Sequence, residues 1–366
     1  MKEKIYPMKY IVIVWTLTTL FAACSKGDKS PVNKPSVDPP VIAKDKYINP
    51  VFTPILADPT VIKDEENDMF YAYGTEDDWG DGKGSHLVAI VKSPNLKDWQ
   101  YVGDAFKVKP NWKSNGGIWA PDVVKVNGKY FMYYSYSIWA DPNAGVGLAV
   151  ADAPQGPFTD KGKLFLSTDI GTPNAIDPFY IEDGGKKYLF YGSYSSEPDN
   201  GIWAVELSDD GMSVPDFSKK TKITSGDTEG AMIHRKGDYY YFFGSKNNCC
   251  DGAASIYQVR IGRSENLMGP YLDKDGKSLA SRGNGSLLIE RNERFAGPGH
   301  NARIITDDAG TDWFLYHAID RGNPTVPSGA NRRALMLDKI EWQNGWPVIK
   351  NGTPSITEQQ APVFND

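Results

Sequence analysis

The chain has 366 residues and a formal net charge of -6, which allows one large domain or a few average ones. The acidic balance argues against nucleic acid or an anionic lipid surface as the main partner. Aromatic residues make up 12% of the chain, a content that suits a protein rich in strands or one that stacks rings on sugars.

The first residues have the features of an export signal. MKEKIYPMKY carries three lysines, and the apolar run IVIVWTLTTLFAA after it is too short to span a membrane comfortably. Ala22 and Ala23 then precede Cys24, an order that resembles a bacterial lipoprotein signal. We predict a signal peptide over residues 1–23 and an exported, lipid-anchored protein on the outer membrane, the cell surface or the periplasmic face. Plain secretion, with Cys24 discarded or free, is the alternative.

Residues 24–46 are polar and Pro-rich and show no apolar periodicity. Such a segment cannot bury enough apolar surface to fold, so we predict a flexible tether. The rest of the chain, 47–366, is expected to form one folded domain.

Five similar stretches recur along this domain. Each has a polar or acidic lead residue, a short apolar run, a charged turn, and an aromatic run that ends in small or polar residues, which is typical of a β-hairpin. They are ADPTVIKDEENDMFYAYGTE, APDVVKVNGKYFMYYSYS, NAIDPFYIEDGGKKYLFYGSY, EGAMIHRKGDYYYFFGSK and GHNARIITDDAGTDWFLYHAID.

The lead residues of these stretches are Asp58, Asp122, Asp177, Glu229 and His300, about 50 to 70 residues apart. A period of this size with about four short strands per unit predicts an all-β protein, a five-bladed β-propeller. The runs are apolar on both faces, as expected for a sheet packed between two neighbours. A sandwich of two sheets is the structural alternative.

In a propeller, the first strands of successive blades line the central axis, so equivalent residues converge. Carboxylates gathered in this way destabilise the fold unless they bind something or share protons. They suggest glycoside hydrolysis, in which one acid protonates the leaving oxygen and another activates water. An oxygen-rich calcium site is the competing explanation.

These motifs together resemble glycoside hydrolase family 43 over roughly Asn49 to Ile349. The resemblance implies that Asp58 of ADPTV is the general base and that Glu229 of EGAMI is the general acid. Asp177 of NAIDP would raise the pKa of the acid and orient it. The family inverts configuration, so base and acid should stand about 6.5–9.5 Å apart.

Further residues are predicted to bind or position the substrate. They are Trp119, Asp122, Asn174, Trp79 and Arg333, with Arg333 also neutralising part of the acid cluster. Asp122 of IWAPDV is expected to be structural or substrate-positioning rather than catalytic. His300 of GPGHN resembles the histidine that arabinan-cleaving members place at the axis, where it would hold a calcium ion through water; a histidine in a buried hydrogen-bond network is the alternative. His317 is expected to be structural.

The segment that begins NNCCDG, with its later GRS and GPY, also resembles arabinanases. We therefore expect a monomeric glycosidase that cleaves α-1,5-linked arabinofuranosyl polysaccharide or oligosaccharide and requires no cofactor. Because ADP replaces the HDP of many arabinanases, a β-xylosidase or xylan-active enzyme is the second reading. A non-catalytic sugar-binding surface propeller is the third. Endo or exo action stays open.

Cys249 and Cys250 are neighbours in a chain expected to be in an oxidising compartment. A bond between adjacent cysteines forces unusual backbone geometry, so both a disulfide and two free thiols remain open. The spacing matches no zinc site.

Overall fold

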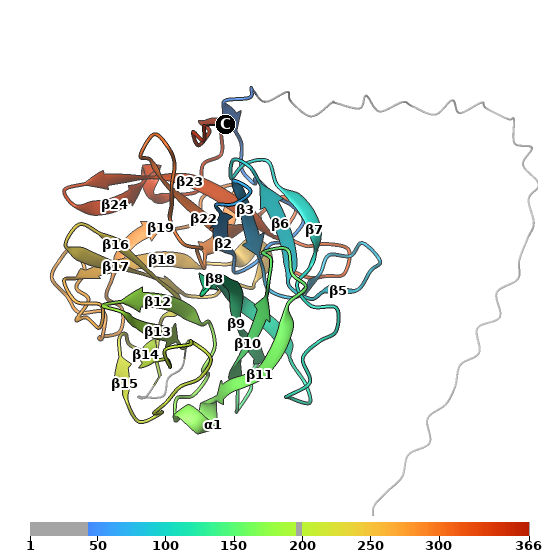
Figure 1. Ribbon diagram of the computed structural model, residues 1–366. Helices are drawn as coiled ribbons and strands as arrows, with labels where there is room; N and C mark the ends of the chain where they lie inside the picture. The colour runs from blue at the N-terminus through green and yellow to red at the C-terminus, as the bar shows by residue number, and fades with distance from the viewer. Residues whose placement is uncertain (1–42, 195–199, 366) are drawn as a thin grey trace, which may run out of the picture. The chain divides into compact units, whose positions relative to one another are not determined.

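The computed structural model describes residues 43–194 and 200–365. Within them, five sheets follow one another around a centre (Figure 1). This confirms the predicted five-bladed propeller and excludes the two-sheet sandwich. The predictions made for residues 1–42, the signal peptide and most of the tether, lie outside the described residues.

Each of the first four blades is an antiparallel sheet of four strands in meander order. Blade 1 contains β2 (Thr60–Asp64), β3 (Met69–Tyr73), β6 (Ala89–Ser93) and β7 (Gln100–Asp104). Blade 2 contains β8 (Gly117–Val126), β9 (Lys129–Ser137), β10 (Gly145–Ala151) and β11 (Thr159–Leu166). Blade 3 contains β12 (Phe179–Asp183), β13 (Lys186–Tyr191), β14 (Trp203–Glu206) and β15 (Lys220–Lys222). Blade 4 contains β16 (Glu229–Lys236), β17 (Tyr239–Lys246), β18 (Gln258–Ser264) and β19 (Ser286–Ile289).

Blade 5 has one strand more than the others. It contains β20 (Phe295–Gly299), β22 (Asp312–Asp320), β23 (Arg333–Gln343) and β24 (Trp346–Ile349), with β21 (Ile305–Thr306) also paired to β22. A hairpin of β4 (Asp77–Asp78) and β5 (Ser85–His86) extends from blade 1. The helices are single turns: α1 (Ser167–Ile170), η1 (Gly252–Ala254) and η2 (Lys350–Gly352). None of the helices in the described ranges has the length and apolarity needed to cross a bilayer.

The two ends of the described chain meet. β1 (Lys46–Tyr47) pairs antiparallel with β25 (Gln359–Gln360). Next to it, Phe52 forms a bridge with Leu335 of β23, and the Asn49 side chain donates to the Leu337 carbonyl at 2.9 Å. The first described residues are thereby held along the last blade.

The predicted turn chemistry forms the hairpins between inner strands. Asn127 and Gly128 join β8 to β9 with φ of 50° and 77°, and Gly184 and Gly185 join β12 to β13 with φ of 57° and 76°. Two left-handed residues in a row match the twist of antiparallel strands, which is why Asn-Gly and Gly-Gly are favoured there. Buried apolar side chains from facing sheets then fill the space between blades, as where Tyr133 of blade 2 stacks on Tyr180 of blade 3 at 5.5 Å.

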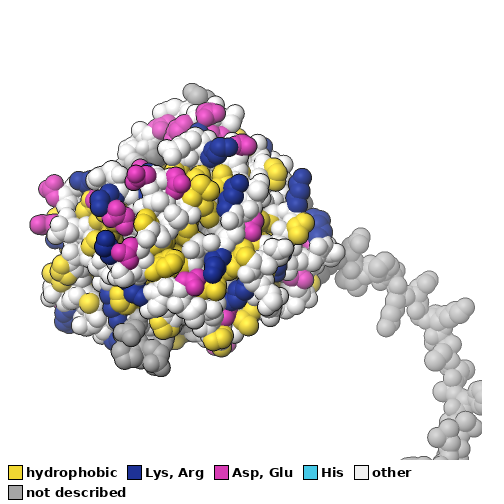
Figure 2. All heavy atoms as spheres, turned by 60° about the horizontal axis from the view of Figure 1, so that its bottom comes forward, with side chains coloured by type: hydrophobic (Ala, Val, Ile, Leu, Met, Phe, Trp, Pro, Cys, Tyr) yellow, Lys and Arg dark blue, Asp and Glu magenta, His cyan; other side chains and the backbone are white. Residues whose placement is uncertain are grey.

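The visible surface mixes charges of both signs. On the face in Figure 2, basic and acidic side chains lie among hydrophobic ones, without a continuous basic surface. This face therefore offers no extended site for a polyanion, in agreement with the overall negative charge.

Candidate active site

A cavity of about 580 Å³ opens where the inner strands begin. Acidic and basic side chains from different blades line it, namely Asp58, Asp77, Asp177, Glu229, His300 and Arg333. Its remaining walls include aromatic and apolar residues, among them Trp119, Trp139 and Ile176. A charged floor with apolar walls suits a sugar, which has both hydroxyl groups and C–H faces.

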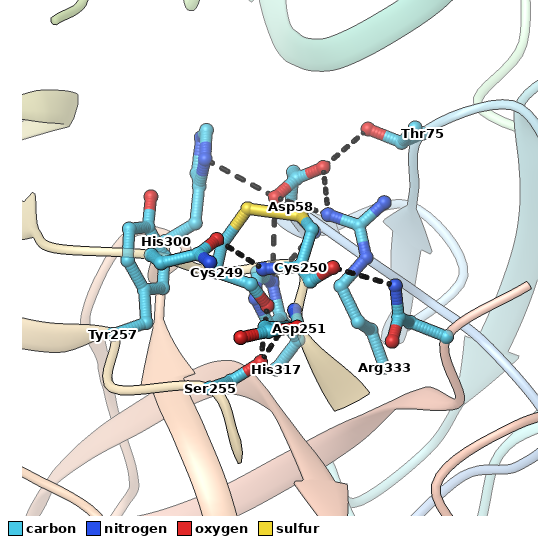
Figure 3. Close-up of a disulfide and its surroundings, with 12 residues drawn as sticks. Asp58, Thr75, Cys249, Cys250, Asp251, Ser255, Tyr257, His300, His317 and Arg333 are labelled. Carbon is cyan, nitrogen blue, oxygen red and sulfur yellow. Dashed lines mark hydrogen bonds and ion pairs between the residues drawn. A yellow bond between two sulfur atoms is a disulfide. The ribbon is translucent and has the colours of Figure 1, made fainter. Parts of the chain in front are cut away.

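Asp58 stands two residues before β2 in a left-handed conformation, with φ of 50°. Nη1 of Arg333 donates to both carboxylate oxygens at 2.9 and 3.1 Å, and the Thr75 hydroxyl donates to Oδ2 at 2.6 Å. Burial alone would raise the pKa of Asp58, but Arg333 and His300 outweigh it and hold the pKa well below its usual range. Asp58 is therefore ionised at neutral pH. Figure 3 shows its contacts with Arg333, Thr75 and the two histidines described next.

Two histidines contact Asp58 in different ways. Nδ1 of His317 accepts from the Asp58 backbone N–H at 3.0 Å, and burial lowers the His317 pKa to about 3, so this imidazole is neutral. Nδ1 of His300 lies 3.3 Å from Oδ1 of Asp58. Burial would lower the His300 pKa, but Asp58 and then the other carboxylates raise it to about 9. His300 is thus cationic at neutral pH, whereas His317 fixes the backbone of Asp58.

Glu229 is the first residue of β16, and both of its carboxyl oxygens accept hydrogen bonds. The Tyr257 hydroxyl donates to Oε1 at 2.6 Å, and the Ser193 hydroxyl donates to Oε2 at 2.7 Å. Burial raises the Glu229 pKa and outweighs these two donors. Glu229 therefore holds its proton to a higher pH than an ordinary glutamate.

Asp177 stands two residues before β12, as Asp58 stands two residues before β2, and it too is left-handed, with φ of 55°. Its Oδ2 accepts from the Gly230 N–H at 3.2 Å, which ties it to the residue after Glu229. Burial raises the Asp177 pKa to about 7; the His300 charge opposes this rise, and the Glu229 carboxylate adds to it. The two carboxyls form a coupled pair that retains a proton close to pH 7.

The His300 ring stands between the base segment and the acid segment. It contacts Asp58 on one side, and a β-carbon on Gly230 would lie 3.1 Å from its ring atoms on the other. Gly230 also has a φ of 58°, so both space and backbone conformation require glycine there. The imidazole therefore lies next to both Asp58 and the residue that follows Glu229.

A family model, Glycosyl hydrolases family 43, matches residues 47–347. The chain belongs to this family. It is 32% identical over 304 residues to the extracellular endo-α-(1→5)-L-arabinanase 1 of Bacillus subtilis, covering 80% of this chain and 87% of that protein. It is 30% identical to the extracellular exo-α-(1→5)-L-arabinofuranosidase ArbA of Cellvibrio japonicus, covering 78% and 84%. A Cellvibrio cellulosa α-L-arabinanase solved with arabinohexaose superimposes with a TM-score of 0.68 at 28% identity, covering 80% and 95%.

Most of the predicted site residues of this family 43 hydrolase line the cavity. Asp58, Asp177, Glu229, Trp119, Asn174, Arg333 and His300 all do so. The ring centroid of Trp119 lies 5.7 Å from that of Trp139. Trp139 is an exposed aromatic residue that the sequence analysis did not single out. The expectation that Arg333 neutralises part of the acid cluster agrees with its contacts to Asp58 and Asp77.

Two predicted substrate-binding residues do not line the cavity. Trp79 is 8% exposed, stacks on His86 at 4.1 Å and packs against Phe52, so the Gly-rich loop turns this ring inward. Asp122 is 4% exposed and is held by Arg303, as well as by Thr60 and Tyr180. Of the two roles predicted for Asp122, structural and substrate-positioning, these contacts support the structural one.

The offset of Asp122 has a local cause. The residue of blade 2 that shares the left-handed conformation of Asp58 and Asp177 is Ala120, with φ of 42°. A register shift between Trp119 and Asp122 follows, and Asp122 lies two residues further along the strand. It therefore sits level with Thr60, whose hydroxyl donates to it at 3.1 Å, and not level with Asp58.

Several contacting residues carried no signal in the sequence. Thr75 ends the first hairpin, Ser193 follows β13, Tyr257 precedes β18, and Arg303 follows β20. Each is a common residue type in a connecting segment, and only the fold brings it to its carboxylate. Thr75 and Ser193 each follow the glycine that ends an aromatic run, and this was the repeated feature available.

The predicted calcium ion has little support from protein ligands. Among the residues described here, no group of three or more His, Cys, Asp or Glu side chains is arranged to hold a metal. The His300 Nδ1 also faces Asp58. The side chains do not fit an ion held directly by several protein groups, and a calcium held through water stays a prediction.

A second cavity, of about 570 Å³, lies among blade 5, β1 and the C-terminal segment. Its buried acids are already bonded: Asp338 accepts from the Tyr316 hydroxyl at 2.6 Å, and Asp307 accepts from Trp313 Nε1 at 2.9 Å. Burial raises the Asp338 pKa to about 6; burial would raise that of Asp307 too, but hydrogen bonds from the Val363 N–H and Trp313 lower it. Because donors within the fold already hold these carboxyls, we assign acid–base chemistry to the first cavity.

Proposed function

We propose that this family 43 hydrolase cleaves α-1,5-linked arabinan with inversion. The observation that carries the proposal is that one cavity holds two carboxyls whose pKa values move in opposite directions. Arg333 and His300 keep Asp58 ionised, while burial keeps a proton on the Glu229–Asp177 pair. Catalytic acid and base are recognised by such divergence.

In this proposal Asp58 is the general base and Glu229 the general acid. Asp58 takes a proton from a water that attacks the anomeric carbon, and Glu229 gives its proton to the leaving oxygen. Asp177 touches the acid segment through Gly230 and is the positioning residue that helps to keep Glu229 protonated. Water is the only co-reactant of this step.

Arabinan is proposed because the relatives named above act on α-1,5-arabinan or were solved with arabinohexaose. Trp119 and Asn174 are proposed to contact the sugar from the cavity wall. The named relatives include both an endo-acting and an exo-acting enzyme, so the product pattern has to decide between the two modes.

The test is incubation with linear arabinan, branched arabinan, xylan, and the aryl arabinofuranoside and xyloside, with release of reducing ends as the readout. Hydrolysis of linear arabinan is expected; a ladder of products indicates endo action, and a single product indicates exo action. Cleavage of xylan or the xyloside alone would replace arabinan by the xylan-active alternative. Binding of arabinan without hydrolysis of any of these would establish a non-catalytic propeller.

We also propose export, since two named relatives are extracellular, and a lipid anchor at Cys24. Cell fractionation and the mass of the mature N-terminus check this. A membrane-bound chain that becomes released in Cys24→Ala is expected. A soluble mature chain of unmodified mass would contradict the anchor.

The calcium prediction is checked by dialysis against a chelator. A calcium held through water near His300 should raise the melting temperature by a few degrees when it is restored, as for any ligand that binds only the folded state. An unchanged melting temperature and no calcium by elemental analysis would remove it.

A further inference from the structure

The loop between β17 and β18 carries a disulfide between two neighbours in the chain, Cys249 and Cys250. Of the two alternatives left open by the sequence, the bonded form is the one present. The mechanism above does not use it. Yet both cysteines line the same cavity as Asp58 and Glu229.

Hydrogen bonds hold the backbone of this loop independently of the sulfurs. The Ser255 hydroxyl donates to the Cys249 carbonyl at 3.1 Å. The Asn331 side chain, on the connection between β22 and β23, donates to the Cys250 carbonyl at 3.2 Å and accepts from the Gly252 N–H at 2.8 Å. The loop of blade 4 is thus fastened to blade 5, so the disulfide is not required to attach it.

The bond holds the two sulfurs together, and both cysteines line the cavity. In Figure 3 the disulfide is drawn in front of Asp58, with His300 to one side and Arg333 to the other. A disulfide has no N–H or O–H to donate, so it gives the charged cavity a polarisable apolar wall.

The disulfide also stands where two cavities meet. An adjoining cavity of about 540 Å³ is lined by Glu229, Cys249 and Trp139, together with Lys246 and Arg282. Glu229 lines both cavities, but Asp58 lines only the first. In the proposed reaction the base acts on the sugar that is attacked and the acid acts on the leaving group. The disulfide therefore borders the bond to be cleaved.

We propose that the Cys249–Cys250 disulfide is a substrate-contacting wall, against which a C–H face of an arabinofuranosyl ring packs. This inference rests on the proposed function and adds a specificity element to the same site. A contact made in the ground state and in the transition state alike lowers KM and leaves kcat unchanged. Loss of the wall should therefore raise KM for arabino-oligosaccharides.

The test compares the wild type with the double variant Cys249→Ala/Cys250→Ala, using arabinotriose and linear arabinan. We expect KM to rise about 5- to 30-fold, the range for loss of one well-packed apolar contact, with kcat within about 2-fold. Ile256→Ser is the matched control, because Ile256 is 45% exposed on the same loop and lines neither cavity. Its KM should stay at the wild-type value.

Reduction of the wild type is the second arm, and it needs no folded variant. Dithiothreitol gives two electrons and two protons to the S–S bond, which yields two thiols and the cyclic disulfide of the reagent. The reductant should raise the wild-type KM as the double substitution does and should leave the double variant unaffected. The double variant retains Cys24, so this comparison isolates the pair.

An unchanged KM in the folded double variant, or in the reduced wild type, would overturn the inference. So would a fall in kcat or melting temperature with KM intact, because this would mean that the disulfide only supports the fold. If the oxidised wild type does not hydrolyse arabinan at all, the proposed function fails instead. The two failures are therefore distinguishable.

Discussion

Two buried aspartates of this propeller are each paired with an arginine, yet of the two only Asp58 lines the cavity. Asp58 meets Arg333 at the cavity, where its carboxylate also accepts from Thr75. Asp122 meets Arg303 deeper along an inner strand, where Thr60 and the Tyr180 N–H occupy its oxygens as well. An offset of two residues along equivalent strands separates them. Position in the strand, and not the ion pair, therefore decides which of the two carboxylates reaches the cavity.

The largest expected effect is on catalysis. Asp58→Asn and Glu229→Gln each remove a proton transfer while preserving shape, so kcat should fall by about 10²- to 10⁴-fold or more. Initial rates on linear arabinan measure this, and circular dichroism checks the fold. Near wild-type activity in either folded variant would refute the assigned role.

The contrasting effect is expected on stability. Asp122→Ala leaves the partly buried Arg303 guanidinium without its carboxylate and, among the described residues, with only the Tyr180 carbonyl as acceptor, which should cost about 1.5–3 kcal/mol of the free energy of unfolding. Urea denaturation measures it. The folded fraction should retain its kcat, because Asp122 does not line the cavity. If Asp122→Ala kept wild-type stability but lost activity, Asp122 would be a residue of the active site and not a structural one.

A smaller effect is expected on the pH dependence. Burial raises the Asp177 pKa to about 7, so wild-type activity should fall as the pH rises through about 7 and the coupled pair loses its proton. Asp177→Asn removes a neighbouring negative charge, which lowers the Glu229 pKa. The alkaline limb of kcat/KM should therefore move to lower pH. Profiles of both proteins check this, and an unmoved limb would show that Asp177 does not act on the acid.

The smallest effects compare two tryptophans. Trp119→Ala removes part of the cavity wall and should raise KM about 10-fold, as expected for a lost aromatic contact. Trp79→Phe changes a ring that packs on His86 and should lower stability by about 1 kcal/mol without changing KM. Substrate titrations and thermal melts separate the two effects. A raised KM in Trp79→Phe would instead support the original prediction that Trp79 binds substrate.

The sequence allowed the blades to be predicted because each hairpin repeats one pattern of apolar runs and turn residues. It also predicted which acids gather, since Asp58 and Asp177 stand at the same phase of that pattern. The position of Asp122 relative to the other lead residues was predicted wrongly. No residue of the APDVV segment signals the register shift after Trp119. The residues that contact the acids, such as Tyr257 and Arg303, lie in connecting segments far away in the sequence. They reach the acids only when the blades have packed together.

The pairing of β1 with β25 has a consequence for the order of folding. Lys46 and Tyr47 can pair only after Gln360 and Gln359, far later in the sequence, have been synthesised. Contacts this distant in sequence carry a high loop-closure cost and form slowly. The blades can assemble as they emerge, but the β1–β25 pair can form only after Gln360 has been synthesised. A chain shortened before β25 would leave its first strand without a partner.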